Sequence, residues 1–475
     1  MDEFIGRIAE QKILKQKLES KQSEFVAVYG RRRVGKTLLI RRTYESHFAF
    51  QLTALAKTST AQQQLLNFHL AFDEIKNTPP YDTPPENWLY AFHRLRLYIN
   101  GLQEAKKVVF FDELPWFDTP HSDFIQALEH FWNSWASARS DIILIVCGSA
   151  ASWMINNLIN NHGGLHNRIT DRIHLVPFNL RETELFLKQK NPAIDRYQVI
   201  QFYMALGGIP FYLNAIDPAQ SAIQNIEKLC FSQDGLLRLE FNNLYPALFS
   251  NAERHIIAVR ALSTKSKGLT REEIIKLTGL PNGGGTTQVL EELEQSGFIR
   301  RYIPFQKKKR NSLYQLVDFY TLFYLKFIEP SNPLDKDQWL HMLDHPSYRA
   351  WSGYAYEQIC LYHVQDIKQA LGISGIQSKT FAWKSNNENQ NVQIDLLIDR
   401  RDRVINLCEI KFSAQEFTIT KAYASDLQRK IKVFKDETAT KKAVFLTLIT
   451  TYGLKENTYL HSLVQQDLNM SIFFD

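Results

Sequence analysis

The chain has 475 residues, which suggests roughly three domains at the usual ~100 to 200 residues each. Its net charge of +6 is modest, and no apolar run approaches the ~18 residues that a membrane span needs. The first residues have neither the basic start nor the apolar core of a signal peptide. We therefore expect a cytoplasmic protein with no membrane partner. None of the four cysteines belongs to a Cys-x-x-Cys pair, so we expect reduced core residues.

The first predicted elements are a helix over 8–18 and a strand, loop and helix over 25–40. The loop reads Gly30-x-x-x-x-Gly35-Lys36-Thr37, a phosphate-binding pattern in which backbone N–H groups surround the β-phosphate. Lys36 reaches the β- and γ-oxygens, and the Thr37 hydroxyl is a Mg²⁺ ligand. The two glycines give angles and clearance that a Cβ would block. The predicted nucleotide-binding residues are Gly30, Arg31, Arg32, Arg33, Val34, Gly35, Lys36, Thr37 and Leu38.

Further elements of this first part follow in order. The helix over 8–18 either flanks the adenine or is an ordinary capped helix. A strand over 48–53 and a helix over 61–75 come next, and then a strand from Lys107 that ends in Asp112 and Glu113. We expect Asp112 to hold Mg²⁺ through a water or a hydrogen bond to Thr37, and Glu113 to polarise the attacking water as general base. A pair of carboxylates after an apolar run is by itself weak evidence for a nucleotide-hydrolysis site. It becomes strong evidence when a phosphate-binding loop precedes it in the chain.

Two more candidates lie between residues 141 and 176. The buried strand over 141–149 ends at Ser149, which either reads the γ-phosphate or belongs to a simple Gly-Ser turn. Arg168 and Arg172 precede a short predicted strand over 173–176. Either arginine could stabilise transition-state charge in a neighbouring subunit of a homo-oligomer, and the alternative is an ordinary solvated arginine.

These motifs together resemble one family of nucleotide hydrolases. The resemblance is to the archaeal-type ATPases of the STAND/AAA+ group, and it is carried by Phe4–Arg7, Tyr29–Thr37, Phe111–Trp116, Cys147–Ser149 and Gly207–Pro210. It implies ATP binding with Mg²⁺ and a parallel five-stranded sheet of order 5-1-4-3-2, followed by a helical lid. It also implies that Gly208 and Pro210 of that lid touch the nucleotide base. The helical apolar periodicity of 180–249, interrupted at 208–210, agrees with this.

A smaller basic module follows. Helices are predicted over 252–262, 269–278 and 286–295, with Thr270 and Glu273 as a capping box, before a two-stranded wing with its tip at Lys307–Arg310. This order resembles a winged-helix domain. Residues 263–310 hold ten Lys and Arg against five Glu, a net +5, so the tip could neutralise phosphates of DNA, with RNA not excluded. Glutamates on the third helix oppose such an approach, and many winged helices bind only proteins; the glutamates are Glu291, Glu292 and Glu294.

The last part holds a second group of chemical side chains. A predicted helix over 348–369 carries Glu357, and strands over 393–399 and 404–411 carry Asp395 and Glu409-x-Lys411. Residues two apart in a strand share a face, so Glu409 and Lys411 point together. Asp395 and Glu409 could then share Mg²⁺ or Mn²⁺, while Lys411 orients water or stabilises developing charge and Glu357 supports the site.

This order of residues resembles the PD-(D/E)xK nuclease superfamily, with Ile394 where the name-giving proline would stand. The predicted fold class is therefore multidomain α/β. We expect an ATPase core over 1–178, a helical lid over 179–249, a winged helix over 250–330 and a nuclease-like domain over 331–475. Three functions stay open: an ATP-driven nuclease, which the complete residue sets favour, an ATP-dependent switch that binds without cutting, and a transcription regulator.

Overall fold

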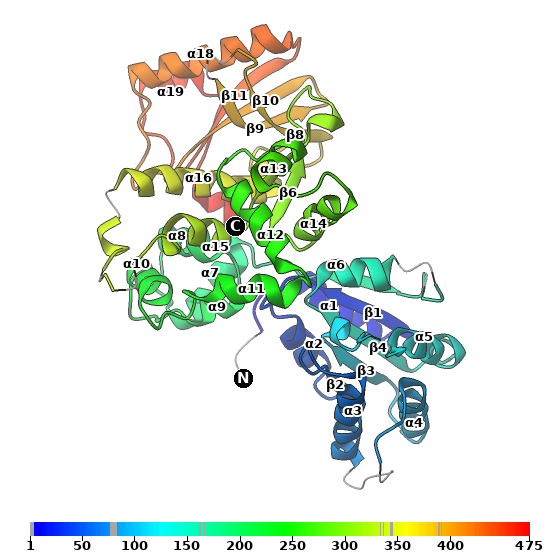
Figure 1. Cartoon of the computed structure of the whole chain (residues 1–475). Coiled ribbons are helices and arrows are strands. Elements are labelled where there is room, and N and C mark those ends of the chain that lie inside the picture. Colours follow the sequence, from blue (N-terminus) through cyan, green and yellow to red (C-terminus); the bar gives the residue numbers. More distant parts are fainter. Residues whose placement is uncertain are drawn as a thin grey trace. The chain divides into compact units, whose positions relative to one another are not determined.

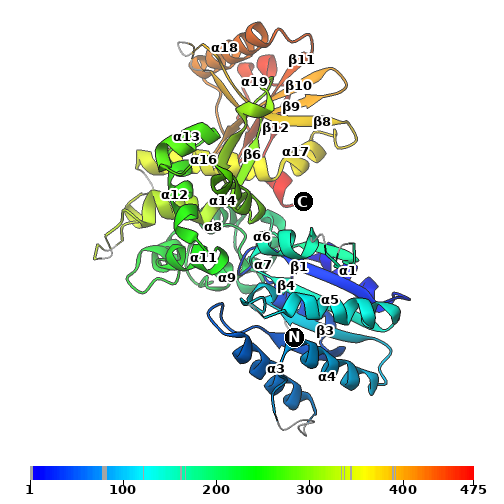
Figure 2. The ribbon, with the colours of Figure 1, turned by 45° about the vertical axis from the view of Figure 1, so that its right-hand side comes forward.

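The computed structural model describes most of the chain, in two compact units. The described residues are 4–76, 83–120, 122–160, 163–165, 167–332, 334–335, 337–342, 345–387, 390 and 392–475. The first unit runs to Pro177 and includes Leu248–Ser250, and the second contains Phe178–Ala247 and Asn251–Asp475 (Figures 1 and 2). Each unit has its own sheet. The finer division into four domains stays a prediction.

The first unit is built on a five-stranded parallel sheet. Its strands in spatial order are β2 (Phe48–Thr53), β3 (Lys107–Asp112), β4 (Ile142–Gly148), β1 (Glu24–Tyr29) and β5 (Asp171–His174). The predicted order 5-1-4-3-2 is confirmed. The predicted strand over 173–176 was placed two residues late, because β5 pairs with Val26–Tyr29 and the partner strand ends at Tyr29.

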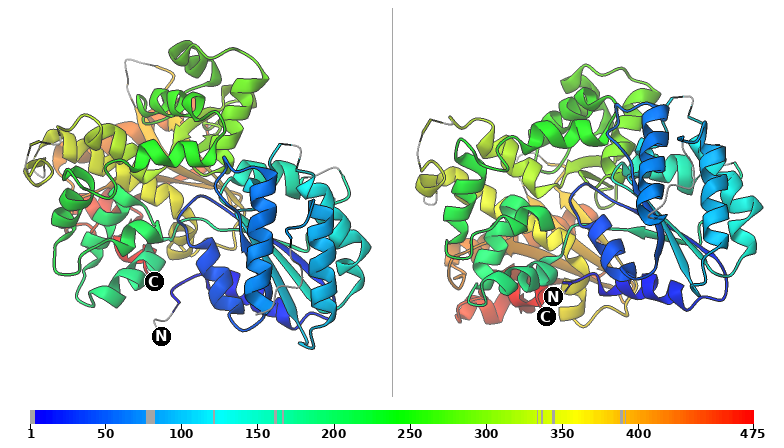
Figure 3. Two further views of the ribbon diagram at one scale, coloured as in Figure 1. Left: turned by 60° about the horizontal axis from the view of Figure 1, so that its bottom comes forward. Right: turned by 90° about the horizontal axis from the view of Figure 1, so that it is seen from below.

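Helices cover both faces of this sheet (Figure 3). They are α1 (Ile8–Leu18), α2 (Lys36–Tyr44), α3 (Ala61–Lys76), α4 (Trp88–Asn100), α5 (Phe124–Ser134), the single turn α6 (Ala151–Trp153) and the short η1 (Leu114–Trp116), η2 (Ala136–Ala138) and η3 (Met154–Ile159). On one face Tyr44 joins α2 to α1 by donating a hydrogen bond to the Leu14 carbonyl at 2.7 Å, and its ring packs on Phe48. The other face is covered by α3, α4 and α5 through one hydrophobic cluster.

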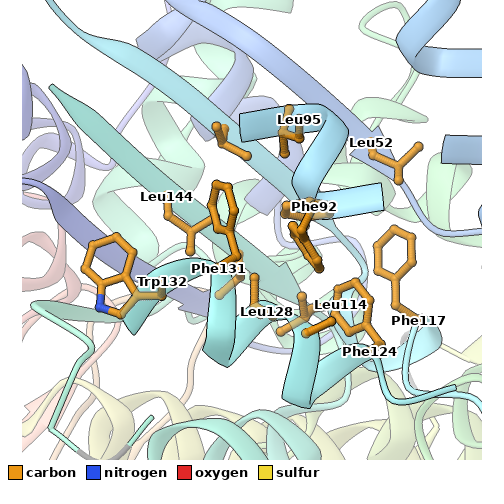
Figure 4. Close-up of a cluster of buried hydrophobic side chains, with 14 of the residues drawn as sticks. Leu52, Phe92, Leu95, Leu114, Phe117, Phe124, Leu128, Phe131, Trp132 and Leu144 are labelled. Atoms are coloured by element: carbon orange, nitrogen blue, oxygen red, sulfur yellow. The ribbon is translucent and has the colours of Figure 1, made fainter. Parts of the chain in front are cut away.

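Aromatic side chains dominate that cluster. Figure 4 shows Phe92, Phe117 and Phe124 gathered beneath the sheet. The Phe111 ring of β3 lies 5.6 Å from Phe92 and 5.8 Å from Phe117, and the latter pair is edge-to-face. Each such ring stabilises the fold by about 1.5–3 kcal/mol through burial. This packing fixes the carboxyl end of β3, where Asp112 stands.

The second unit begins with the segment predicted as a lid. Its helices are α7 (Leu180–Lys190), α8 (Arg196–Leu206), α9 (Pro210–Asn214), α10 (Ala222–Ile226), η4 (Glu227–Phe231) and α11 (Glu240–Leu248). The predicted interruption at 208–210 falls between α8 and α9. Gly208 is required there because a Cβ would lie 1.9 Å from the Phe178 carbonyl oxygen.

Three helices and an antiparallel hairpin follow. These elements are α12 (Ala252–Ser263), α13 (Arg271–Thr278), α14 (Gly284–Gln295), β6 (Ile299–Tyr302), η5 (Lys309–Asn311) and β7 (Leu313–Leu316), then α15 (Phe319–Phe323), η6 (Tyr324–Ile328) and η7 (Leu340–Met342). The capping box of Thr270 and Glu273 is confirmed at the start of α13.

A mixed five-stranded sheet forms the C-terminal part. Its elements are α16 (Pro346–Tyr362), α17 (Val364–Ala370), β8 (Ser378–Lys384), β9 (Gln393–Arg400), β10 (Val404–Lys411), α18 (Lys421–Thr438), β11 (Ala443–Thr450), α19 (Thr458–Leu463), β12 (Gln466–Leu468) and η8 (Met470–Phe473). The order is β12-β11-β10-β9-β8; β8, β9 and β10 are antiparallel, and β10, β11 and β12 are parallel. Leu407 packs in one cluster with Leu427 of α18, whereas Cys408 lies near Cys360 of α16, so the two helices cover opposite faces.

The predicted single helix over 348–369 is wrong, because it breaks at His363. That residue has φ −101° and ψ 30° between α16 and α17. Its Nδ1 lies 2.9 Å from the Ile359 carbonyl oxygen, and its Nε2 accepts a hydrogen bond from the Leu180 backbone N–H at 3.2 Å. The ring therefore joins the start of α7 to the C-terminal part of the same unit.

Other expectations concern the whole described chain. All four cysteines are buried and outside any disulfide, as predicted. Burial and the nearby Asp112 carboxylate raise the pKa of the Cys147 thiol well above its usual value. In the part of the chain that the structure describes, no helix is long and apolar enough to cross a membrane.

Burial of His363 makes stability depend on pH. Burial lowers the pKa of His363 to about 4, so between about pH 6.5 and 4 the unfolded chain binds more protons than the folded one. The free energy of unfolding should fall as pH drops through this window, by up to about 1.4 kcal/mol per pH unit. Thermal unfolding at pH 7.5 and 5.5 should show a smaller difference in His363→Gln than in the parent. His461→Gln is the control, since that side chain is 70% exposed. An unchanged pH dependence in His363→Gln would contradict this account.

Candidate functional site

The phosphate-binding loop joins β1 to α2 in the first unit. Gly30, Arg33 and Gly35 have φ values of 148°, 71° and 92°. At Gly30 a Cβ would lie 2.1 Å from the Leu175 carbonyl oxygen, so only glycine fits. Backbone in such conformations turns successive N–H groups into one concavity, which suits an anion.

Lys36 begins α2 and points back across the loop. Its ammonium donates to the carbonyl oxygens of Gly30 and Arg31, both at 3.0 Å, and the residue is buried. Arg31 and Val34 are also buried, whereas Leu38 is 53% exposed. The loop therefore already places a cation where phosphate oxygens would need one.

The segment before α1 contacts the same loop. The Arg7 guanidinium donates to the Val34 carbonyl oxygen at 3.3 Å, and Arg7 itself is 3% exposed. Arg7 precedes α1 in a left-handed conformation, with φ 55°. The segment thus lies beside the nucleotide loop, and its predicted contact with adenine stays a prediction.

The predicted metal and base residues gather at the carboxyl ends of β3 and β4. The Thr37 hydroxyl donates to Asp112 Oδ2 at 2.8 Å, across the loop. Glu113 adopts φ 54° and ψ 47°, and its Oε2 accepts from the Ser149 backbone N–H at 3.0 Å and from the Ser149 hydroxyl at 2.7 Å. Ser149 therefore positions the carboxylate of Glu113, a contact that the sequence did not predict.

Other predicted nucleotide-site residues lie elsewhere. Arg168 and Arg172 are both exposed, in the loop before β5 and on β5 itself. Gly208 and Pro210 belong to the second unit, where Pro210 is the first residue of α9. The roles proposed for these four residues stay predictions.

The second unit brings together two of the carboxylates predicted in its C-terminal part, Glu357 and Asp395. Cys408 pairs with Leu396 in the antiparallel ladder, and the same register continued by one residue sets Glu409 opposite Asp395. Asp395 also interacts with Glu357 of α16. Burial, followed by the neighbouring Asp395, raises the pKa of Glu357 above its usual range.

A lysine from outside the C-terminal part holds two of these carboxylates. The Lys267 ammonium lies 2.9 Å from Glu357 Oε2 and also donates to Asp395 Oδ1. Burial would raise the pKa of Asp395, but the Lys267 charge holds it below its usual value. Lys267 lies between α12 and α13, 90 residues before Glu357 and 128 before Asp395. No local sequence pattern predicts that Lys267 contacts Glu357 or Asp395.

Glu409 has partners on α18 instead. Its Oε1 accepts from the Lys430 ammonium at 2.8 Å and its Oε2 from the Tyr423 hydroxyl at 3.2 Å. The Lys411 ammonium lies 5.2 Å from the centre of the Tyr423 ring, so Glu409 and Lys411 do point together. Tyr423 and Lys430 are seven residues apart, two helical turns, so they share one face of α18, and this spacing after Glu409-x-Lys411 can be read in the sequence. Within the described residues, no group of three or more His, Cys, Asp or Glu side chains is arranged to hold a metal ion.

The nucleotide-site geometry agrees with a match to a known sequence family. Residues 4–216 match the family described as an ATPase domain predominantly from Archaea. The chain is similar to that family over this stretch. Such a domain implies a nucleotide and usually Mg²⁺, and the hydrogen bond between Thr37 and Asp112 sets two fitting oxygens side by side.

The similarity to one relative covers more of the chain than residues 4–216. An uncharacterised protein of Methanocaldococcus jannaschii is 22% identical over 441 residues, which cover 90% of this chain and 92% of the relative. The Walker-type ATPase of Pyrococcus abyssi covers 68% of this chain and 96% of its own, at 16% identity and a TM-score of 0.47. The ORC2 protein of Aeropyrum pernix covers 69% and 96%, at 13% identity and a TM-score of 0.44.

Two substitutions should separate ATP binding from turnover. Lys36→Ala should remove most affinity and all hydrolysis, because its charge meets the phosphates already in the ground state. Glu113→Gln should keep the affinity and lower kcat about 100-fold or more, as expected for a general base. Nucleotide binding by calorimetry and phosphate release measure the two effects. Glu104→Gln is the matched control, because Glu104 lies before the amino end of β3, where its carbonyl accepts from Lys107. Unchanged turnover in Glu113→Gln would exclude it as the base.

Proposed function

We propose that this chain is an ATPase whose nucleotide state controls a metal-dependent nuclease in its C-terminal part. The proposal keeps the division into an ATPase core (1–178), lid (179–249), winged helix (250–330) and nuclease-like domain (331–475). ATP and Mg²⁺ belong to the first site and Mg²⁺ or Mn²⁺ to the second. We expect DNA as the substrate, with RNA left open.

One observation carries the nuclease proposal. Glu357, Asp395 and Glu409 come from a helix and two neighbouring strands; Glu357 interacts with Asp395, and the register of β9 and β10, continued by one residue, sets Glu409 opposite Asp395. Their oxygens are the ligand type that hard divalent cations take, so the donor set fits Mg²⁺ or Mn²⁺ in residue type. Such an ion, held by Asp395 and Glu409, would activate a water for attack on a phosphodiester. Lys411 would stabilise the developing charge.

A basic groove supports nucleic acid as the substrate. A groove of about 520 Å³ runs between the hairpin and the edge strand β8; four cations and one carboxylate line it, namely Arg301, Lys309, Lys368, Lys379 and Glu294. Two of the glutamates expected to repel DNA have hydrogen-bond or ion-pair partners within residues 250–330. Glu292 lies 2.7 Å from the His255 ring, and Glu294 accepts from the Arg301 backbone N–H at 3.3 Å.

The alternative is an ATP-dependent switch of STAND type that binds nucleic acid or protein without cutting. It is favoured by the lysines on the carboxylates. Lys267 holds Glu357 and Asp395, and Lys430 holds Glu409, so charge is neutralised here by the chain itself. A transcription regulator working through α14 has no specific observation in its favour.

The nuclease proposal is tested by Asp395→Asn. This change should abolish cleavage of plasmid and single-stranded DNA with Mg²⁺ or Mn²⁺, because it removes a charged ligand, and it should leave ATP hydrolysis near the parental rate. Asp399→Asn is the matched control on the same strand, where Asp399 pairs with Lys442. If the parent never cuts DNA or RNA under any nucleotide or metal condition, and Asp395→Asn loses no Mn²⁺ binding, the switch replaces the nuclease.

Binding in the groove is tested separately by charge reversal. Lys379→Glu should weaken DNA binding and reduce the slope of log K against log salt concentration by about 0.9 for duplex, which corresponds to one phosphate contact. Lys228→Glu is the control, because that lysine lies in the predicted lid and its side chain is 59% exposed. Equal slopes for the parent and both variants would place the nucleic acid elsewhere.

A further inference from the structure

Lys267 lies in the turn between α12 and α13, and its side chain pairs with two carboxylates of the C-terminal part. Its ammonium contacts Glu357 on α16 and Asp395 on β9, and its side chain is only 21% exposed. Burial alone would lower the pKa of Lys267, but Asp395 and Glu357 raise it above its usual value. The side chain therefore stays charged where it lies.

The backbone around Lys267 is fixed to the hairpin. The Lys267 carbonyl accepts from the Tyr302 hydroxyl at 2.6 Å, and the Ser266 carbonyl accepts from Gln315 Nε2 at 2.6 Å. Gly268 has φ 84°, and a Cβ there would lie 2.3 Å from the Tyr314 carbonyl oxygen. The turn is thus held by β6 and β7 on one side and by α16 on the other, because the Tyr354 hydroxyl also donates to the Ser266 carbonyl at 3.1 Å.

An ammonium and a divalent cation have the same electrostatic role between two carboxylates. Each cancels the repulsion between Asp395 and Glu357, and each needs the same oxygens. Asp395 has one further neutral donor, the Gln393 side-chain amide at 3.0 Å. Both donors lie on Oδ1, so a metal ion that takes Oδ1, alone or together with Oδ2, must displace Lys267 from it.

We propose that Lys267 is a competitor for divalent cation built into the chain, which occupies Asp395 and must leave it before a metal ion binds there. This inference rests on the proposed nuclease function, since it concerns the regulation of the same site. Tyr302 holds the Lys267 carbonyl and also lines the basic groove. The same hairpin therefore contacts both the competitor and the surface proposed for nucleic acid.

The test compares Mn²⁺ binding by the full chain and its variants, measured by calorimetry. Lys267→Met removes the charge and keeps the length of the side chain, so Mn²⁺ should bind at least tenfold more tightly, and the gain should vanish when Asp395→Asn is added. Lys267→Arg should bind as weakly as the parent because it restores the charge. The control Lys265→Met lies two residues away and loses only a surface pair with Glu273, so it should not change Mn²⁺ affinity.

A second variant covers the case in which Lys267→Met does not fold. Tyr302→Phe removes only the hydroxyl that holds the Lys267 carbonyl, so Mn²⁺ should again bind more tightly, by a smaller factor. Mn²⁺ affinity equal to the parent's in every folded variant of Lys267 and Tyr302 overturns the proposal. So does loss of cleavage in Lys267→Met without a change in Mn²⁺ affinity, which would make Lys267 part of the cleavage machinery.

Failure of this inference differs from failure of the proposed function. Cleavage that depends on Asp395 and is unaffected by Lys267→Met keeps the nuclease and removes the competitor. Tighter Mn²⁺ binding in Lys267→Met, with no cleavage by any variant, keeps the competitor and removes the nuclease. Tighter binding together with faster cleavage at limiting metal supports both.

Discussion

Parallel pairing of β1, β3 and β4 is the constraint on which the nucleotide site depends. Parallel strands run in one direction, so their carboxyl ends share an edge of the sheet, and that edge here carries Gly30, Asp112 and Ser149. The hydrogen bond from Thr37 to Asp112 joins the loop after β1 to the end of β3, on the other side of β4. Because a slip of one residue would turn Asp112 to the other face, the buried aromatic cluster behind β3 also maintains the chemistry.

Charge neutralisation has the corresponding role in the second unit. A buried carboxylate without a partner is costly, by several kcal/mol, so each acidic group there needs a cation. The partners come from other elements, Lys267 from the turn after α12 and Lys430 from α18. The Lys267 contacts therefore both join the turn after α12 to α16 and β9 and neutralise Glu357 and Asp395.

Prediction from sequence succeeded where the signal is local. The phosphate-binding loop and the strands ending at Asp112 and Lys411 follow from apolar runs and fixed spacings, and the structure has them at the predicted positions. The helix break at His363 was not predicted, because its ring bonds to Leu180, 183 residues away. The edge strand β8 and the later α18 and β11 were not assigned either. The strands β8 and β11 depend on pairing with β9 and β10, whereas α18 carries a local signal, the N-cap Thr420, which was missed.

The sequence by itself determined which chemical groups are present and which neighbours share a face. Gly30 to Thr37 form a phosphate-binding loop wherever a strand precedes and a helix follows, and Glu409 and Lys411 point together because side chains in a strand alternate. Only the tertiary structure decided which cation each carboxylate meets. Lys267 reaches Asp395 across 128 residues of chain. An ion pair depends on distance in space, and folding sets that distance through contacts that neither residue's sequence neighbours encode.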